Sequence, residues 1–403
     1  MKKRTLLGCL AIYSAVSFGV PHLEMEMTAQ QYAAYFEAHP ELNQLTKSSA
    51  LNPVMEMGKR FLEWLNYINA NSGGGTLSLS SAATAVGYPI DSPRLSNPSR
   101  ILASFDELKS SLPASYQNIL FKGAAFTGNP NPGGGEFIHW GLAIVSNYQS
   151  ASRWILQEPF LISYSGRRKM DLRGYYFLEK ESDLLEKLKN WAGLPLEDKT
   201  RLSSWLMGQC FNSNSSESSC RLELQSSNNI LSYYQKYRGP AKSLWDSLFT
   251  ISNPRHDIEW TSSHADELRI PFRTPSILKI QKFLVDNIEE EWKWDQWQLR
   301  LQFKNNAASN VAFEAGATPH VEGVGGNTIT MDANAPLAEY DVQWTIRHEF
   351  GHILGFPDCY LEFFDDRSQT MVSYQLDISN LMCSRRGHLK QTHYDQLRKN
   401  YYH

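Results

Sequence analysis

The sequence predicts an α+β protein with a mainly helical N-terminal region that carries some strands, followed by a smaller mixed region. Apolar residues recur at helical spacing in residues 20–120 and again after residue 184, whereas segment 298–303 (QLRLQF) alternates like a strand. Helices and strands therefore follow each other in blocks. With 403 residues and 42% hydrophobic side chains, the chain is long enough for two or three domains with cores of their own.

The N-terminus has the pattern of a secretory signal peptide. Three basic residues at positions 2–4 precede a mainly apolar stretch at 6–18, and small residues follow up to Gly19. A membrane span needs about 20 apolar residues, so this stretch is too short for one, although an uncleaved anchor is the alternative. We therefore expect a signal peptide at 1–19 and a mature chain without a membrane span that is secreted or periplasmic.

The cysteines agree with export. Once residues 1–19 are removed, four cysteines remain, at positions 210, 220, 359 and 383. An even number in an exported chain indicates two disulfide bonds, and four cysteines allow three pairings. Short spacing favours Cys210–Cys220 and Cys359–Cys383, and four thiols in a reducing compartment are the alternative.

Residues 20–265 are expected to form an N-terminal domain or propeptide. Helical spacing predicts helices at 30–39 and 54–70, and later near 184–191 and 231–249. Alternating and β-branched runs predict several short strands within 136–177, after a Gly-rich loop at 128–135. A polar stretch at 253–266 marks the expected boundary with the second domain.

Residues 266–403 are expected to form a small mixed domain. An amphipathic helix at 277–292 precedes strands at 298–303 and 328–331, with a Gly-rich turn at 322–327 between the strands. A helix at 340–354 follows, with one apolar face that includes Ile346, Phe350 and Ile353.

The chemistry of the chain is expected on this last helix. His348 and His352 are four residues apart and therefore lie on one helix face, where both imidazoles can bind a single metal ion such as Zn²⁺. Glu349 beside them has the position of a general base. Gly355 can end the helix in the left-handed conformation, so that Asp358 returns as a third ligand. Three protein ligands leave one position for water, as in catalytic zinc sites.

This region resembles the metzincin metallopeptidases over residues 266–403. The resemblance rests on HEFGHILGFPD at 348–358 and on NLMC at 380–383, which is similar to the family's Met-turn. It implies a twisted sheet with an active-site helix, one Zn²⁺ per chain, and Met382 as an apolar support beneath the metal. It also implies that the strand before the helix, at 323–331, forms a sheet edge that pairs with substrate.

The sequence departs from most metzincins at two positions. The third ligand is Asp358, as in the snapalysin-type branch, where most members have histidine. Ser384 stands where some members have a tyrosine that stabilises the oxyanion. Glu362 ranks below Asp358 as a ligand, and His388 and His393 are expected at the surface or behind the ligands.

We therefore expect a secreted zinc-dependent endopeptidase that acts on protein or peptide substrates. The formal net charge of −3 argues against a dedicated nucleic-acid binder. Two alternatives remain open: a catalytically inactive zinc-fold adaptor, and a metal-dependent amidase that acts on a non-protein amide. An intact Glu349 argues against the adaptor. Residues 20–265 are expected either to hold the catalytic domain latent or to recruit substrate.

Overall fold

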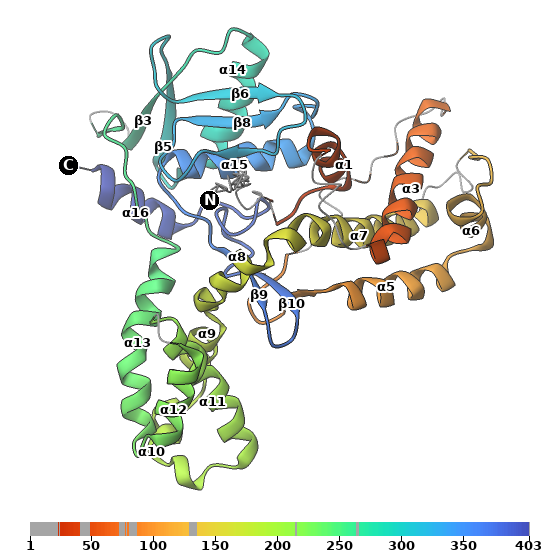
Figure 1. The fold of residues 1–403 in the computed structure, drawn as a ribbon. Coiled ribbons are helices and arrows are strands. Elements are labelled where there is room, and N and C mark those ends of the chain that lie inside the picture. Colours follow the sequence, from red (N-terminus) through yellow and green to blue (C-terminus); the bar gives the residue numbers. More distant parts are fainter. Residues whose placement is uncertain are drawn as a thin grey trace, which may run out of the picture.

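The protein is described by a computed structural model that covers residues 23, 25–40, 49–71, 77, 79, 87–128, 135–213, 216–262 and 266–402. Its architecture is α+β, as the sequence predicts, with many helices and three small sheets (Figure 1). The expected signal peptide and Cys9 lie outside the described residues. Within these ranges, every helix is too short or too polar to cross a membrane.

The first helices pack around an aromatic core. Trp64 and Phe61 of α3 contact Phe137 of α7, with ring centroids 5.0 and 5.2 Å apart. Tyr116 of α6 packs edge-on against Trp64 at 5.1 Å. This group comprises α1 (Ala29–Ala38), η1 (Ser49–Leu51), α3 (Asn52–Asn71), α5 (Pro98–Ser111), α6 (Ala114–Phe121) and α7 (Gly135–Gln157).

The expectation of strands within 136–177 is wrong, because this segment is helical. Buried residues of α7 recur at helical spacing, as at Phe137, Gly141, Ile144, Tyr148 and Ala151, and this periodicity outweighs the β-branched composition. The chain continues through η2 (Glu158–Phe160), α8 (Leu161–Gly166), η3 (Arg167–Met170) and α9 (Arg173–Lys180).

A helical arm, residues 167–247, extends away from the rest of the molecule (Figure 1). α9 and α11 pack closely where they cross at Gly174. A Cβ atom at this position would lie only 2.5 Å from the carbonyl oxygen of Trp205, so the packing requires glycine. The disulfide Cys210–Cys220 joins α11 to α12. After α9, the arm comprises α10 (Leu184–Lys189), η4 (Trp191–Gly193), α11 (Leu196–Phe211), α12 (Glu217–Ser226) and α13 (Ile230–Ser247).

The mixed part of the molecule contains two of the sheets. One has the order β2-β3-β5-β4, in which β3 and β5 are parallel, and the other has the order β6-β8-β7. Their strands are β2 (Glu259–Thr261), β3 (Asp266–Phe272), β4 (Lys293–Trp294), β5 (Trp297–Phe303), β6 (Asn310–Glu314), β7 (His320–Val321) and β8 (Thr328–Asp332). The helices are α14 (Leu278–Leu284), continued by a π-helical turn at Val285–Glu289, α15 (Tyr340–Ile353) and α16 (Gln391–Tyr401).

The expected edge strand lies inside its sheet. β8 pairs with β6 in parallel and with β7 in antiparallel orientation, so it is the middle strand. Gly323 and Gly325 adopt positive φ angles of 77° and 78°, and this turn brings His320 and Val321 back alongside Thr330 and Ile329. The expectation of an edge position for 323–331 is therefore wrong.

The third sheet contains strands from the N-terminal region and from the C-terminal part of the chain. β9 (Tyr360–Asp365) and β10 (Thr370–Gln375) form a hairpin, and β1 (Arg94–Ser96) pairs with β10 on its other side. A strand of the N-terminal region thus belongs to the sheet that begins two residues after Asp358. The expected division of the chain at residue 265 stays a prediction.

Candidate metal centre

The two histidines lie on the buried helix α15, which runs beneath β6 and β8 (Figure 1). Its apolar face, with Ile346, Phe350 and Ile353, is fully buried. His348 and His352 are also buried, and their ring centroids lie 5.0 Å apart with perpendicular planes. The helix therefore places both imidazoles side by side in a site largely shielded from water.

Each imidazole is oriented by a backbone carbonyl. Nδ1 of His348 lies 2.8 Å from the carbonyl oxygen of Leu381, and Nδ1 of His352 lies 2.8 Å from that of Phe356. Because a carbonyl oxygen only accepts hydrogen bonds, Nδ1 carries the proton in both neutral rings and Nε2 carries the lone pair. This is the arrangement in which histidine binds a metal through Nε2.

Asp358 completes the cluster after a sharp turn. Gly355 adopts a φ of 90°, and its N–H donates to the carbonyl oxygen of His352 at the helix end. Oδ1 of Asp358 then lies 3.2 Å from Nε2 of His348 and 3.2 Å from Nε2 of His352. The ligand atoms all lie within 4.8 Å of one another, so one cation can contact all three.

The charges of the cluster suit a divalent cation. Burial disfavours the charged form of His352, but the Asp358 carboxylate, with help from Glu349, raises the pKa of the imidazole above its usual value. Burial also disfavours ionised Asp358, yet the two imidazoles hold its pKa well below the usual range. A carboxylate beside two imidazole nitrogens is a donor set that can hold a metal ion.

Glu349 is completely buried on the same helix. Its carboxylate acts electrostatically on His352 and is therefore close to the cluster. Its role as a general base stays a prediction.

Met382 packs against the helix next to the two histidines. A Cβ atom on Gly351 would lie only 2.2 Å from Sδ of Met382, so the methionine packs directly against the helix between the two histidines. The N–H of Met382 donates to Oδ1 of Asn380, which also accepts from Nε2 of His393. Glycine at 351 is thus what allows this close contact.

A disulfide bond and a hydrogen bond join the Asp358 loop to this turn. Cys359 is bonded to Cys383, as short spacing favours, and the N–H of Cys359 donates to the carbonyl oxygen of Met382. Both expected disulfides are confirmed. Because Leu381 orients His348 and Cys359 follows Asp358, the same turn positions two of the three candidate ligands.

The other candidate ligands lie outside the cluster. Glu362 forms a buried ion pair with Arg153, which confirms its lower rank. His388 is exposed and lies beside Glu291. His393 is buried behind the Asn380 turn, where burial and Lys390 lower its pKa to about 4, so it is neutral and acts as a donor to Asn380.

Sequence analysis missed the contributions of the N-terminal region. A cavity of about 360 Å³ opens beside Asp358, and its walls come from both halves of the chain. Glu26 accepts hydrogen bonds from Ser384 and from Gln375. The cavity is lined by Leu23, Tyr164, Arg167, Met170 and Leu248, together with Asp358 and residues 360–363. No local pattern signals these contacts.

Comparison of the chain with protein-family models, curated proteins and solved structures found no match.

Proposed function

We propose that the chain is a zinc-dependent endopeptidase of metzincin type. The observation that carries this proposal is the convergence of three donor atoms, Nε2 of His348, Nε2 of His352 and Oδ1 of Asp358, beside the buried carboxylate of Glu349. Two neutral imidazoles and one carboxylate leave a coordination position for water, which a structural zinc site does not. The signal peptide expected at 1–19 and the two disulfides fit a secreted enzyme.

Each residue has a defined task in this proposal. His348, His352 and Asp358 hold Zn²⁺, which when bound polarises a carbonyl group and lowers the pKa of water. Glu349 accepts a proton from the attacking water and passes it to the departing amine. The carbonyl groups of Leu381 and Phe356 keep the two imidazoles in the required tautomer.

The substrate class follows from the surroundings of the cluster. The cavity beside Asp358 is mostly apolar, with Leu23, Met170 and Leu248 in its walls, and it has room for at least one large side chain. Glu362 also lines this cavity, but Arg153 neutralises it. A polypeptide side chain next to the bond that is cleaved fits these walls.

Metal content and turnover test the proposal separately. We expect one zinc ion per chain by native mass spectrometry, and its loss in His352→Ala. His388→Ala is the matched control, because that histidine is exposed and outside the cluster. Equal zinc occupancy in wild type and His352→Ala contradicts the ligand assignment.

Glu349→Gln should retain the zinc ion because the side chain is not a ligand. Its rate of peptide hydrolysis should fall at least about a hundredfold, the usual contribution of general acid–base catalysis. Hydrolysis of a quenched-fluorescence peptide library measures this rate. A variant with near-normal activity would show that another group activates the water.

A further inference from the structure

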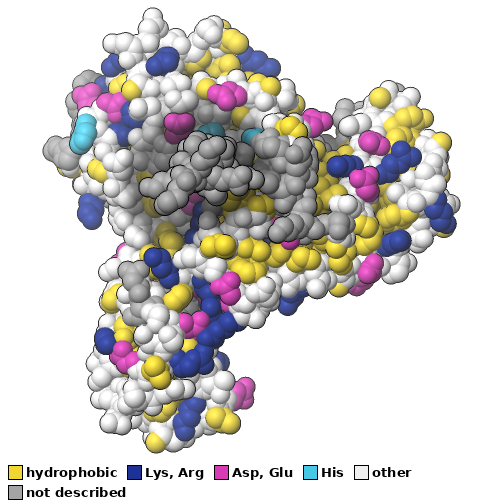
Figure 2. All heavy atoms as spheres, in the orientation of Figure 1, with side chains coloured by type: hydrophobic (Ala, Val, Ile, Leu, Met, Phe, Trp, Pro, Cys, Tyr) yellow, Lys and Arg dark blue, Asp and Glu magenta, His cyan; other side chains and the backbone are white. Residues whose placement is uncertain are grey.

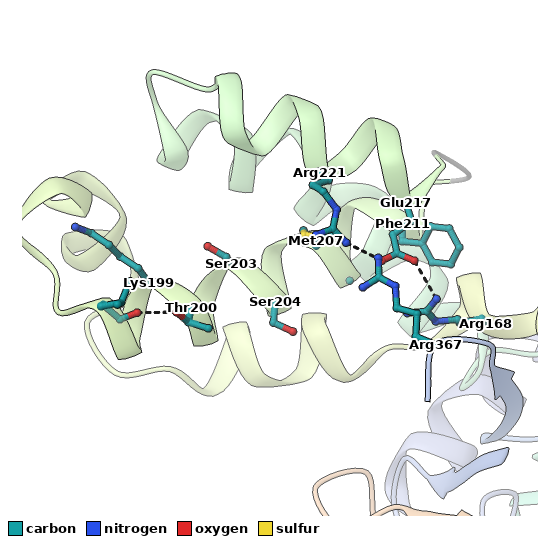
Figure 3. A pocket seen from close by; sticks show the side chains of 12 residues that line it. Arg168, Lys199, Thr200, Ser203, Ser204, Met207, Phe211, Glu217, Arg221 and Arg367 are labelled. Carbon is teal, nitrogen blue, oxygen red and sulfur yellow. Dashed lines mark hydrogen bonds and ion pairs between the residues drawn. The ribbon is translucent and has the colours of Figure 1, made fainter. Parts of the chain in front are cut away.

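A second large groove lies on the helical arm, outside the metal centre. Its volume is about 530 Å³, and one face of α11 forms its floor. Arg168 of η3, Arg221 of α12 and Arg367 of the β9–β10 turn meet at one end of the groove (Figure 3). We call the whole site the arginine groove.

The three arginines share one carboxylate. Arg168 and Arg221 contact Glu217 at 2.9 and 3.5 Å, and Arg367 also forms an ion pair with it. Lys199 lines the same groove, so its lining carries four cations and one carboxylate. Figure 2 shows Lys and Arg side chains gathered where the arm meets the rest of the molecule. Asp365 also pairs with Arg168, at 3.2 Å, so two carboxylates face four cations; they neutralise only part of this charge, and the groove attracts anions.

The remainder of the groove is long and has apolar residues at both ends of α11, with the hydroxyl groups of Thr200, Ser203 and Ser204 between them (Figure 3). Leu196 is 81% exposed at one end of α11, and Met207 and Phe211 line the groove nearer the arginines. From Leu196 to Phe211 the helix extends about 22 Å, the length of roughly seven residues of extended polypeptide. A free phosphate would use only the arginine end, whereas a polypeptide with apolar residues followed by carboxylates would use the whole groove.

The arginine groove is connected to the metal centre through two adjacent elements. On η3, Arg167 lines the cavity beside Asp358 while its neighbour Arg168 lines the arginine groove. On β9, residues 360–363 line the cavity, and the chain reaches Arg367 in the following turn. Nine residues separate Asp358 from Arg367, so the two sites are at most about 32 Å apart.

We propose that the arginine groove binds an acidic segment of the polypeptide substrate at a distance from the bond that is cleaved. This inference rests on the proposed peptidase function, since it makes the segment part of the substrate. Arg221 and Arg367, which are 46% and 53% exposed, contact the carboxylates of this segment, and its apolar residues cover Leu196 and Met207.

Binding is tested on the full-length Glu349→Gln chain, which does not consume the peptide. The probe is a fluorescein-labelled heptapeptide in which three apolar residues are followed by four acidic residues, Asp or Glu. Fluorescence anisotropy compares its binding with that of a control peptide in which each Asp is replaced by Asn and each Glu by Gln. We expect at least tenfold tighter binding of the acidic peptide, and weakening when salt rises from about 0.05 to 0.5 M. Equal binding of the two peptides would overturn the proposal, as would tighter binding of an RNA of about ten nucleotides.

The double variant Arg221→Gln/Arg367→Gln should lose this preference. Arg238→Gln is the matched control, because Arg238 is an equally exposed arginine on the arm that pairs with Glu179 outside the groove. In cleavage assays, a substrate with the acidic segment about ten residues from the scissile bond should show a lower KM than its Asn/Gln counterpart, with kcat unchanged. The double variant should remove that difference in KM.

The two proposals fail in different ways. If no peptide is cleaved but the acidic peptide still binds selectively, the peptidase function is wrong and binding of acidic polypeptide by the groove stands. If peptides are cleaved with the same KM regardless of the acidic segment, the groove has no role in substrate binding. If the double variant does not fold, the comparison of the acidic peptide with its Asn/Gln counterpart on the unmodified groove still shows whether the groove prefers acidic polypeptide.

Discussion

Replacement of Arg153 by methionine should destabilise the protein strongly, because it breaks a buried ion pair between α7 and β9. Nε of Arg153 donates to Oε1 of Glu362 at 2.9 Å, and Nη2 donates to Oε2 at 2.5 Å. The two side chains are only 3% and 7% exposed. Arg153 also donates to the hydroxyl of Tyr32 and to the carbonyl oxygen of Leu23.

The size of the effect follows from the carboxylate that is left behind. Without Arg153, Glu362 keeps only two neutral donors, the hydroxyl of Ser373 at 2.8 Å and the amide of Gln157 at 3.3 Å. Removal of one partner from a buried pair costs about 3–5 kcal/mol. With a urea m-value of about 3 kcal/mol/M, the unfolding midpoint should fall by about 1–2 M.

The pH dependence of the loss has a definite sign. In the wild type, burial disfavours ionised Glu362, but Arg153 outweighs burial and lowers the pKa of the carboxyl below 4.5. The ion pair therefore stabilises the folded state fully above pH 4.5, and this contribution disappears as the pH falls through the lowered pKa. In Arg153→Met the largest opposing effect on burial is lost, and only Ser373, Gln157 and the charge of Arg94 still favour the ionised form, so the pKa of Glu362 is higher than in the wild type and the folded state takes up a proton more readily. The difference from wild type should therefore be smaller at pH 5 than at pH 7.

Urea titration followed by tryptophan fluorescence measures both effects. Arg238→Met is the matched control, because Arg238 also forms a two-bond pair, with Glu179, but that pair is 47% and 27% exposed. It should lose no more than about 1 kcal/mol. Arg153→Met/Glu362→Met should be more stable than Arg153→Met alone, since no buried charge remains. A loss below 1 kcal/mol in Arg153→Met, or a loss in the double variant equal to the sum of the single losses, would refute the reasoning.

Two further predictions concern the support of the metal centre. Replacement of Cys359 and Cys383 by alanine removes the disulfide that closes a loop between residues 24 apart in sequence, and should lower the free energy of unfolding by about 3 kcal/mol. Zinc retention should weaken as well, and an unchanged urea midpoint would contradict the prediction. Gly351→Ala places a Cβ atom 2.2 Å from Sδ of Met382, and the resulting strain of about 1–3 kcal/mol should exceed the gain of about 1 kcal/mol in helix propensity. Thermal unfolding should show that Met382→Ala relieves the effect of Gly351→Ala, and a Gly351→Ala chain as stable as wild type would argue against the contact.

The parts of the site that could be predicted from sequence are local in the chain. The helix expected at 340–354 is present and ends only one residue earlier, at Ile353. It could be predicted because its apolar spacing and the turn at Gly355 depend on residues close together in the sequence. The cluster of His348, His352 and Asp358 spans only 11 residues, so helix geometry and one turn determine it. Both disulfides join cysteines 10 and 24 residues apart, and proximity in sequence favours such pairs.

The contacts that could not be predicted are distant in sequence and have no repeating pattern. Glu26 and Ser384 are 358 residues apart, and Arg153 and Glu362 are 209 apart. A buried carboxylate needs a partner, but the sequence alone does not indicate which arginine provides it. The prediction that β8 lies at a sheet edge failed for a similar reason. The two-residue strand that covers this edge, at His320, depends on a turn whose direction only the folded chain determines.

These distant contacts bear on the purpose of residues 20–265. A propeptide that is removed must leave behind a domain that tolerates the loss of its contacts. Here removal would leave Glu362 buried without its arginine, β10 without its neighbour β1, and the cavity beside Asp358 without half of its walls. It would also take away Glu26, which holds the Ser384 turn next to Met382. Because Glu362 lies four residues after Asp358 and Ser384 lies two residues after Met382, we infer that the N-terminal region is a permanent scaffold of the metal centre. Recruitment of substrate through the arginine groove is compatible with that role, and latency relieved by removal of the whole region stays the alternative prediction.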